Sequence, residues 1–284
     1  MMFFLGCAVW ACKDWVGDLF PEGSKPVDFL ALYSRRFTTV EGNTTFYMMP
    51  DPAMVARWAR ETPPGFQFCL KLPRELTHGG LLKPAIPEAL SFLSSMRLLG
   101  DRLGPMFAQL PPIYGPSSFA DLEAFLKAWP RAEVPLALEV RHPDWFREPF
   151  ADRLTGLVEE LGVGKVLLDS RPVYRGPGSP MARSERKKPD LPLQPVVTAP
   201  FSMVRYISHP VEEVNRSYLE EWVTYVSDWL RAGVKVYFFV HCPEEARSPG
   251  NARLFQKLLE QGGAPVPSLP WNGMGTGPSQ LRLF

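Results

Sequence analysis

Two short stretches of the sequence combine acidic, basic and imidazole side chains in a way that could support chemistry. The run TTVEGN carries Glu41 and Asn43, and the run LEVRHPDW carries Glu139, Arg141 and His142. Two carboxylates can serve as general acid and general base when their surroundings separate their pKa values. Arginine can hold an anion, and histidine can carry a proton near neutral pH. These residue types predict acid–base chemistry on an anionic or polyhydroxylated substrate.

Further polar side chains stand at the carboxyl ends of other β-rich runs, namely Lys71, Gln109, Asp169 and Arg205. Side chains two positions apart share one face of a strand. A carboxylate such as Glu41 is costly to bury against an apolar helix layer, so we expect its face to point inward. The same alternation turns the other four side chains inward, so all of them would meet in one polar opening, or mouth, at the carboxyl ends of the strands.

The elements that must position these residues are eight β-rich runs that alternate with segments of helical periodicity. We expect the strands at residues 3–8, 38–43, 67–72, 105–110, 136–141, 164–169, 201–207 and 235–240. A long proline-rich loop at 171–200 replaces most of the sixth helix. The pattern favours an α/β fold of the closed (β/α)8 type, a TIM-like barrel, over an open doubly wound sheet.

The expected mouth, at the carboxyl ends of the strands, supplies candidates for two roles. The candidate catalytic residues are Glu41, Glu139, His142 and Asp169. The candidate substrate-binding residues are Trp10, Asn43, Tyr47, Lys71, His78, Gln109, Arg141 and Arg205. An enzyme with this set would be a hydrolase, a lyase or an isomerase. The alternative is a non-catalytic binding or scaffold protein, in which the same charges form a structural ion-pair network.

Other kinds of site receive less support from the sequence. It contains no G-x-S-x-G nucleophile turn and no glycine-rich nucleotide loop. The four histidines lack the spacing of a zinc motif, and we expect no cofactor, although Glu41, Glu139 and Asp169 could hold a divalent ion. The 171–200 loop is basic and includes Lys187 and Lys188. It is either a solvated linker or a partner for a phosphate-bearing ligand.

Composition limits the partners and the compartment. The 284 residues carry a formal net charge of +1, so no global field draws the chain to nucleic acid or to a membrane. The four cysteines include no C-x-x-C pair, and the first residues do not form a signal peptide or a spanning segment. We expect a cytoplasmic protein without disulfides.

Several longer stretches resemble the YecE-like family, domain of unknown function 72. They include VEGNTTFYMMPDPAMVARWARETPPGFQFCLKLPRELTH, FAQLPP, LEVRHPDWF and SPGNARLFQKLL. The resemblance spans residues 5–260 and implies a TIM-barrel fold, but no particular reaction. This chain departs from the usual family pattern near the N-terminus, where it reads GCAVW, and at the eighth strand, where Val240 and His241 replace an asparagine pair.

The C-terminal stretch has a different character from the rest of the chain. We expect one domain over residues 1–261 and a flexible glycine- and proline-rich tail over 262–284. The tail ends in Q-L-R-L-F, which resembles the motif by which bacterial repair and replication proteins dock on the DNA sliding clamp. The docking residues would be Gln280, Leu281, Leu283 and Phe284. This predicts recruitment to DNA, and the alternative is that these residues fold back on the domain.

Overall fold

The computed structural model describes residues 1–178, 180–183 and 187–273. It contains a strand at each of the eight predicted positions. The strands are β1 (Phe3–Cys7), β2 (Thr39–Gly42), β3 (Gln67–Leu70), β4 (Met106–Gln109), β5 (Leu136–Glu139), β6 (Gly164–Asp169), β7 (Phe201–Ile207) and β8 (Lys235–His241).

Helices connect the strands and begin and end where local chemistry favours it. The α-helices of the described residues are α1 (Phe29–Tyr33), α2 (Thr44–Tyr47), α3 (Pro52–Glu61), α4 (Arg74–His78), α5 (Ile86–Met96), α6 (Phe119–Ala128), α7 (Phe150–Leu161), α8 (Arg171–Arg175), α9 (Glu212–Arg231) and α10 (Ser248–Gln261). At the start of α3, the Asp51 carboxylate accepts a hydrogen bond from the Met54 amide at 2.7 Å. At the end of α7, Gly162 adopts a left-handed conformation with φ of 62°.

The strands do not form the closed eight-stranded barrel that the sequence predicts, and that expectation is wrong. Six parallel strands form one hydrogen-bonded half-barrel sheet in the order β1-β8-β7-β6-β5-β4. Strands β2 and β3 form a separate two-stranded parallel sheet. The ring of hydrogen bonds is therefore interrupted in two places, between β1 and β2 and between β3 and β4.

Side-chain hydroxyls explain the interruption between β1 and β2. The Cys7 amide donates to the Tyr33 hydroxyl at 2.6 Å, and that hydroxyl donates to the Thr39 carbonyl at 3.0 Å. The Leu5 amide likewise donates to the Thr38 hydroxyl at 2.9 Å. Hydroxyls thus take hydrogen bonds that a continuous ladder would make between backbones. Between β3 and β4, the described residues show isolated bridges from Phe68 to Leu103 and from Lys71 to Phe107 in place of a continuous ladder.

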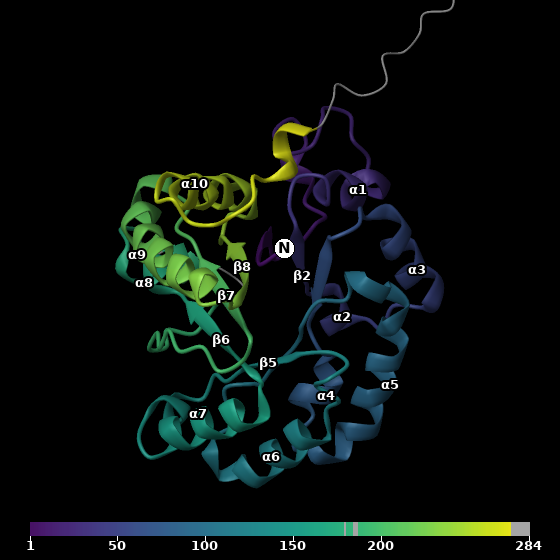
Figure 1. The fold of residues 1–284 in the computed structure, drawn as a ribbon, viewed down its shortest axis with the longest axis vertical. Helices are drawn as coiled ribbons and strands as arrows, with labels where there is room; N and C mark the ends of the chain where they lie inside the picture. Colours follow the sequence, from purple (N-terminus) through teal and green to yellow (C-terminus); the bar gives the residue numbers. More distant parts are fainter. Residues whose placement is uncertain (179, 184–186, 274–284) are drawn as a thin grey trace, which may run out of the picture.

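Helices cover the outer side of the strands and enclose the main apolar core. Figure 1 shows α9 and α10 along the outside of β7 and β8, and α3 and α5 on the opposite side of the molecule. Trp222 of α9 and Phe255 of α10 are fully buried against these strands. A second apolar cluster fills the space inside the strands, with Phe107, Met203 and Phe239 among its members.

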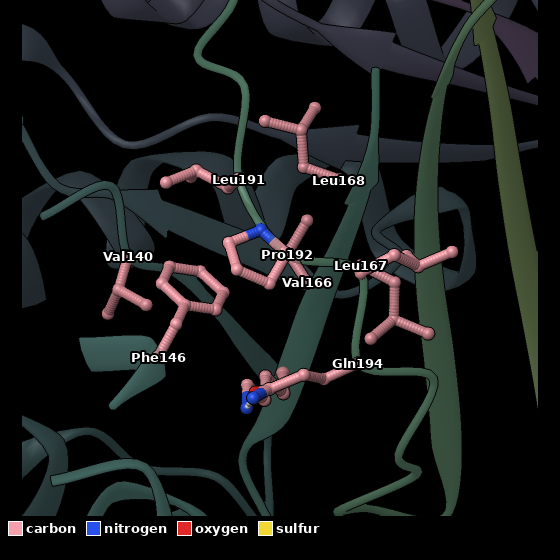
Figure 2. Close-up of a pocket in the computed structure, with 10 residues that line it drawn as sticks. Val140, Phe146, Val166, Leu167, Leu168, Leu191, Pro192 and Gln194 are labelled. Carbon is pink, nitrogen blue, oxygen red and sulfur yellow. Dashed lines mark hydrogen bonds between the residues drawn. The ribbon is translucent and has the colours of Figure 1, made fainter. Parts of the chain in front are cut away.

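The connection after β6 contains one short helix, α8, and then a long extended segment. Figure 2 shows Leu191, Pro192 and Gln194 of this segment beside the residues of β6. Gln194 also accepts a hydrogen bond from the Lys165 amine at 2.8 Å. The segment therefore covers a face of β6 that a longer helix would otherwise cover.

Two further expectations concern parts of the chain away from the strands. No helix in the described ranges is both long and apolar enough to cross a membrane. Residues 262–273 include a short 3-10 helix at Pro270–Gly273, and the Trp271 ring packs edge-on against Phe37 with centroids 5.1 Å apart. Gln280, Leu281, Leu283 and Phe284 lie outside the described residues, so the domain–tail division and the docking motif stay predictions.

Candidate functional site

A pocket of about 890 Å³ opens where the carboxyl ends of the strands meet. The residues that line it follow or end several strands, and a few come from the connection after β6. They are Ala8, Val9, Ala11, Cys12, Asn43, Phe46, Tyr47, Lys71, Arg74, His78, Gln109, Arg141, Met181, Lys187, Lys188, Arg205, Ile207, His241, Cys242, Pro243 and Glu245. Most of the predicted mouth residues are therefore brought together.

The floor of this pocket is a buried ion network centred on Arg205. Its Nε and Nη2 donate to the two oxygens of Glu41 at 2.7 and 2.8 Å, and its Nη1 donates to Glu139. All three side chains are at most 1% exposed. Burial alone would raise the pKa of both carboxyls. Arg205, followed by His241, lowers the pKa of Glu41 well below its usual range, and Arg141, followed by Arg205, lowers that of Glu139 to about 2.

This geometry changes the role predicted for Arg205. Three of its nitrogens are committed to carboxylates, so it balances their charge and is poorly placed to hold a ligand. Removing one partner from such a buried pair leaves an uncompensated charge, which is far more costly than removing an exposed ion pair. Arg205 therefore keeps Glu41 ionised beneath the pocket, and together with Arg141 it keeps Glu139 ionised.

His241 belongs to the same network and lies in the pocket wall. Its Nε2 is 2.9 Å from Glu41 Oε2. Burial lowers the pKa of His241 to about 4, despite the opposing effect of Glu41. A neutral ring must donate from Nε2 to the ionised carboxylate, which leaves Nδ1 as a proton acceptor. Asn43 donates to the other Glu41 oxygen at 2.7 Å and so helps to fix the carboxylate.

The sequence analysis did not include His241 among the candidate site residues. Strand β8 runs to His241, one residue beyond the predicted end. Tyr237 and Phe239 belong to the interior cluster, and a side chain two positions further along shares their face. Extending the observed alternation by one step would have found His241.

A second chain of hydrogen bonds crosses the pocket from β3 to β5. The Lys71 amine donates to Gln109 Oε1 at 2.9 Å, and Arg141 Nη2 donates to the same oxygen at 2.7 Å. Arg141 Nε also donates to Glu139 Oε1 at 2.6 Å. The predicted grouping of Lys71, Gln109, Glu139 and Arg141 is therefore present, and it presents cationic groups to the pocket.

The surroundings of Lys71 weaken its charge. Its amine lies 3.5 Å from the centroid of the Phe46 ring. Burial and the nearby Arg205 lower the pKa of Lys71 to about 7. His78 lies in the same wall, where its Nδ1 is 2.9 Å from the Thr77 hydroxyl, and burial followed by Lys71 lowers the pKa of His78 to about 4.

The connection after β6 contributes a cation that the sequence analysis did not single out as a site residue. Lys188 lines the pocket, and burial together with Arg205 lowers the pKa of its amine to about 8. Its backbone is fixed by two contacts, since its amide lies 3.3 Å from Met181 Sδ and its carbonyl accepts from the Tyr174 hydroxyl. The basic loop therefore reaches the mouth at this residue.

With the fold and the site described, comparison with known proteins places the chain in a family. The family described as "Protein of unknown function DUF72" matches residues 4–274. The chain belongs to the DUF72 family. The UPF0759 protein YecE of Escherichia coli K12 is 33% identical over 276 residues, which are 95% of this chain and 98% of YecE. The UPF0759 protein YunF of Bacillus subtilis 168 is 22% identical, with 100% of both chains covered.

Solved structures of other DUF72 proteins share the fold. The TM1631 protein of Thermotoga maritima MSB8 has a TM-score of 0.69 at 23% identity, covering 92% of this chain and 100% of its own. The EF0366 protein of Enterococcus faecalis V583 has a TM-score of 0.70 at 17% identity, covering 91% and 96%. These likenesses show a shared fold.

Asp169 does not lie at the mouth of this DUF72 chain, and its predicted position is wrong. Its carboxylate accepts from Trp222 Nε1 at 2.8 Å and pairs with Arg171 at 2.9 Å. Trp222 belongs to α9, so Asp169 faces the helix layer. On β6 the side chains of Val166 and Leu168 pack in the apolar clusters, and Asp169 lies on the opposite face of the strand from them.

The side chains of His142 and Trp10 do not line the pocket, although Arg141, Val9 and Ala11 next to them in sequence do. His142 Nδ1 accepts from the Asp144 amide at 3.2 Å and caps the 3-10 helix Pro143–Phe146. Trp10 packs edge-on against Trp58 with centroids 5.3 Å apart. Neither side chain lines the pocket, so the roles predicted for these two residues stay predictions. Tyr47, in contrast, does line the pocket and is 68% exposed.

The three carboxylates considered for a divalent ion are not brought together. Glu41 and Glu139 bind Arg205, while Asp169 binds Arg171 on the other side of the strand. Within the described ranges, no group of three or more histidine, cysteine or acidic residues is arranged to hold a metal ion. The pocket walls instead favour a ligand that is itself negatively charged.

Proposed function

We propose that the pocket binds a small ligand carrying a phosphate or carboxylate group and performs acid–base chemistry on it. The observation that carries this proposal is the charge of the wall. Among the described residues, Lys71, Arg74, Arg141, Lys187 and Lys188 line the pocket in addition to the carboxylate-bound Arg205. The nearby acids are Glu41, Glu139 and Glu245. Cations therefore outnumber acids around a partly desolvated space, which favours an anion.

The proton acceptor would be His241. Its Nδ1 is available when Nε2 donates to Glu41, and Glu41 fixes the ring as a carboxylate does in other histidine-based sites. His241 thus takes the catalytic role that the sequence analysis gave to His142. This arrangement supports a hydrolase, a lyase or an isomerase, with a sugar phosphate or a nucleic-acid phosphate as the anionic group. A non-catalytic anion-binding protein is the alternative.

Calorimetry with inorganic phosphate tests the anion site. Lys188 is the best position for a variant, because it lies on a connecting segment and not in the buried floor. We expect Lys188→Met to weaken phosphate binding about tenfold or more, since a hydrogen bond to a charged group contributes about 1.5–3 kcal/mol. Lys83→Met, on an exposed lysine outside the pocket, is the matched control and should bind as the unchanged chain does. Equal binding by both variants, or no phosphate binding at all, would contradict the proposal.

We further propose that the Q-L-R-L-F sequence docks on the bacterial DNA sliding clamp. Sequence alone supports this proposal: a glutamine and three apolar anchors occur at the motif spacing, after a stretch rich in glycine and proline. Docking would bring a nearly neutral chain to DNA and would make a nucleic-acid phosphate a natural ligand of the pocket.

A further inference from the structure

We propose that Lys71 is a nucleophile that forms a Schiff base with the carbonyl carbon of an anionic aldehyde or ketone. This inference rests on the proposed function, because the cationic wall would hold the ligand's phosphate or carboxylate. It adds the chemical class of the ligand, and it assigns Lys71 a covalent role.

The position of Lys71 fits a nucleophile better than a structural cation. Its side chain follows β3 and reaches the pocket wall, although the residue is only 6% exposed. The amine donates to the neutral amide of Gln109, and in the described part of the chain it makes no ion pair with a carboxylate. The face of Phe46 covers it on one side. An amine held in this way can turn from Gln109 toward a bound ligand.

The same surroundings favour the reactive form of the amine. An ordinary lysine with a pKa near 10.4 is uncharged in fewer than about one molecule in a thousand at neutral pH. Burial and Arg205 lower the pKa of Lys71 to about 7, so about half of the molecules carry a free lone pair at pH 7. Desolvation and a neighbouring cation are the established means of activating a lysine for Schiff-base formation.

The covalent step balances without an added oxidant or reductant. The Lys71 nitrogen adds to the carbonyl carbon, the carbon–oxygen π electrons pass to oxygen, and the oxygen gains the proton that the nitrogen loses. The nitrogen of the resulting carbinolamine then loses its second proton, the hydroxyl gains a proton and leaves as water, and the carbon–nitrogen double bond forms. His78 is largely neutral and lies in the same wall, where it can carry protons between nitrogen and oxygen. Arg141 and Lys188 are placed to hold the anionic group.

Reductive trapping of the imine tests the proposal on the intact chain. The protein is incubated at pH 7 with glyoxylate and cyanoborohydride, which reduces an imine to a stable secondary amine. Peptide mass spectrometry then follows the modification at each lysine. Two lysines in the same digest serve as controls: Lys187 lines the pocket but is exposed, and Lys165 is buried but faces Gln194 outside the mouth. We expect Lys71 to react at least about tenfold faster than either control.

The outcomes separate this inference from the anion site. Selective labelling of Lys71, slowed by added inorganic phosphate and absent in Lys71→Arg, supports the Schiff base. No labelling of Lys71, or labelling no faster than at Lys187, overturns it. Calorimetry with phosphate on the unlabelled protein judges the proposed function independently. Phosphate binding without Lys71 labelling would therefore retain the anion site and reject the covalent role.

Discussion

At the scale of single residues, two arginines keep the carboxyls of the pocket floor ionised: Arg205 beside Glu41, and Arg141 together with Arg205 beside Glu139. Arg205 occupies both oxygens of Glu41 and one oxygen of Glu139, and each carboxyl stays ionised although it is buried. The ionised Glu41 in turn fixes the tautomer of His241. The acid–base properties of the site are therefore a property of this network, and no member can be assigned a role without its partners.

The pH dependence of folding reports on His241. Its pKa is about 4 in the folded chain against 6.5 for an unperturbed histidine, so the unfolded chain binds the proton more readily. The neutral ring's full contribution to stability is present above about pH 6.5 and is lost as pH falls toward 4. We expect the unchanged chain to lose roughly 3 kcal/mol more than His241→Asn over this range.

Urea unfolding of both chains at several pH values measures this difference. Asparagine keeps a hydrogen-bond donor for Glu41 but does not titrate, so His241→Asn removes the titration of the ring while a donor to Glu41 remains. His78 has a pKa lowered in the same direction, and it contributes equally to both chains. Parallel stability curves for the two chains between pH 6.5 and 4 would show that His241 does not titrate as inferred.

At the scale of elements, the Tyr33 hydroxyl is one of two hydroxyls that stand between β1 and β2, beside that of Thr38. Tyr33 accepts from the Cys7 amide and donates to the Thr39 carbonyl, and all three residues are fully buried. Tyr33→Phe would leave both backbone groups without this partner. We expect a loss of about 1–3 kcal/mol in the free energy of unfolding. Tyr47→Phe, at an exposed tyrosine, should change stability by less than about 0.5 kcal/mol.

Denaturant titration of the two tyrosine variants distinguishes these expectations. A Tyr33→Phe chain as stable as the Tyr47→Phe chain would mean that the two strands can pair directly through their backbones. That result would make the interruption incidental to the fold. A selective loss would show that the hydroxyl is an integral part of the strand arrangement.

The strands themselves could be predicted from sequence, but their pairing could not. Each β-rich run became a strand because apolar and β-branched residues recur between turn signals. Between β1 and β2, the Tyr33 and Thr38 hydroxyls take the place of backbone partners, and alternation carries no information about such competition. The general lesson is that strand existence is a local property, whereas sheet continuity depends on side chains from other elements.

The same distinction explains which site residues could be predicted. The residues that alternation turns inward lie together in the structure, because each shares a strand face with an interior apolar residue or another polar one: Glu41, Lys71, Gln109, Glu139, Arg141 and Arg205. It failed for Asp169, because the run GKVLLD has apolar residues in both phases. Lys188 could not be placed by alternation at all, since it reaches the pocket from an irregular connection.

At the scale of the whole molecule, positive charge is concentrated around one pocket. The chain carries a formal net charge of only +1, yet lysines and arginines collect around one pocket. The protein therefore attracts an anion only close to the pocket, and at the exposed edge of the pocket this attraction weakens steeply as the salt concentration rises. A chain of this kind gains little from long-range steering toward DNA, so any association with DNA would need a separate docking element.

The Q-L-R-L-F sequence is the candidate for that element, and its test uses purified sliding clamp. Agreement at its four motif positions by chance is on the order of one in ten thousand or rarer. Calorimetry should give roughly micromolar affinity, about 8 kcal/mol, for the full chain, and none for a form truncated after Ser279. Arg282→Ala is the matched control, because it changes the variable position and keeps Gln280, Leu281, Leu283 and Phe284.

The mechanism of docking predicts how these three chains differ. Apolar anchors supply most of the energy of such short motifs, so the arginine can be replaced at little cost while loss of the anchors abolishes binding. If the full chain gives no heat with the clamp and is not retained on immobilised clamp, the recruitment proposal fails. The pocket would then act on a free small anion, because no other described feature of this nearly neutral chain would bring it to DNA.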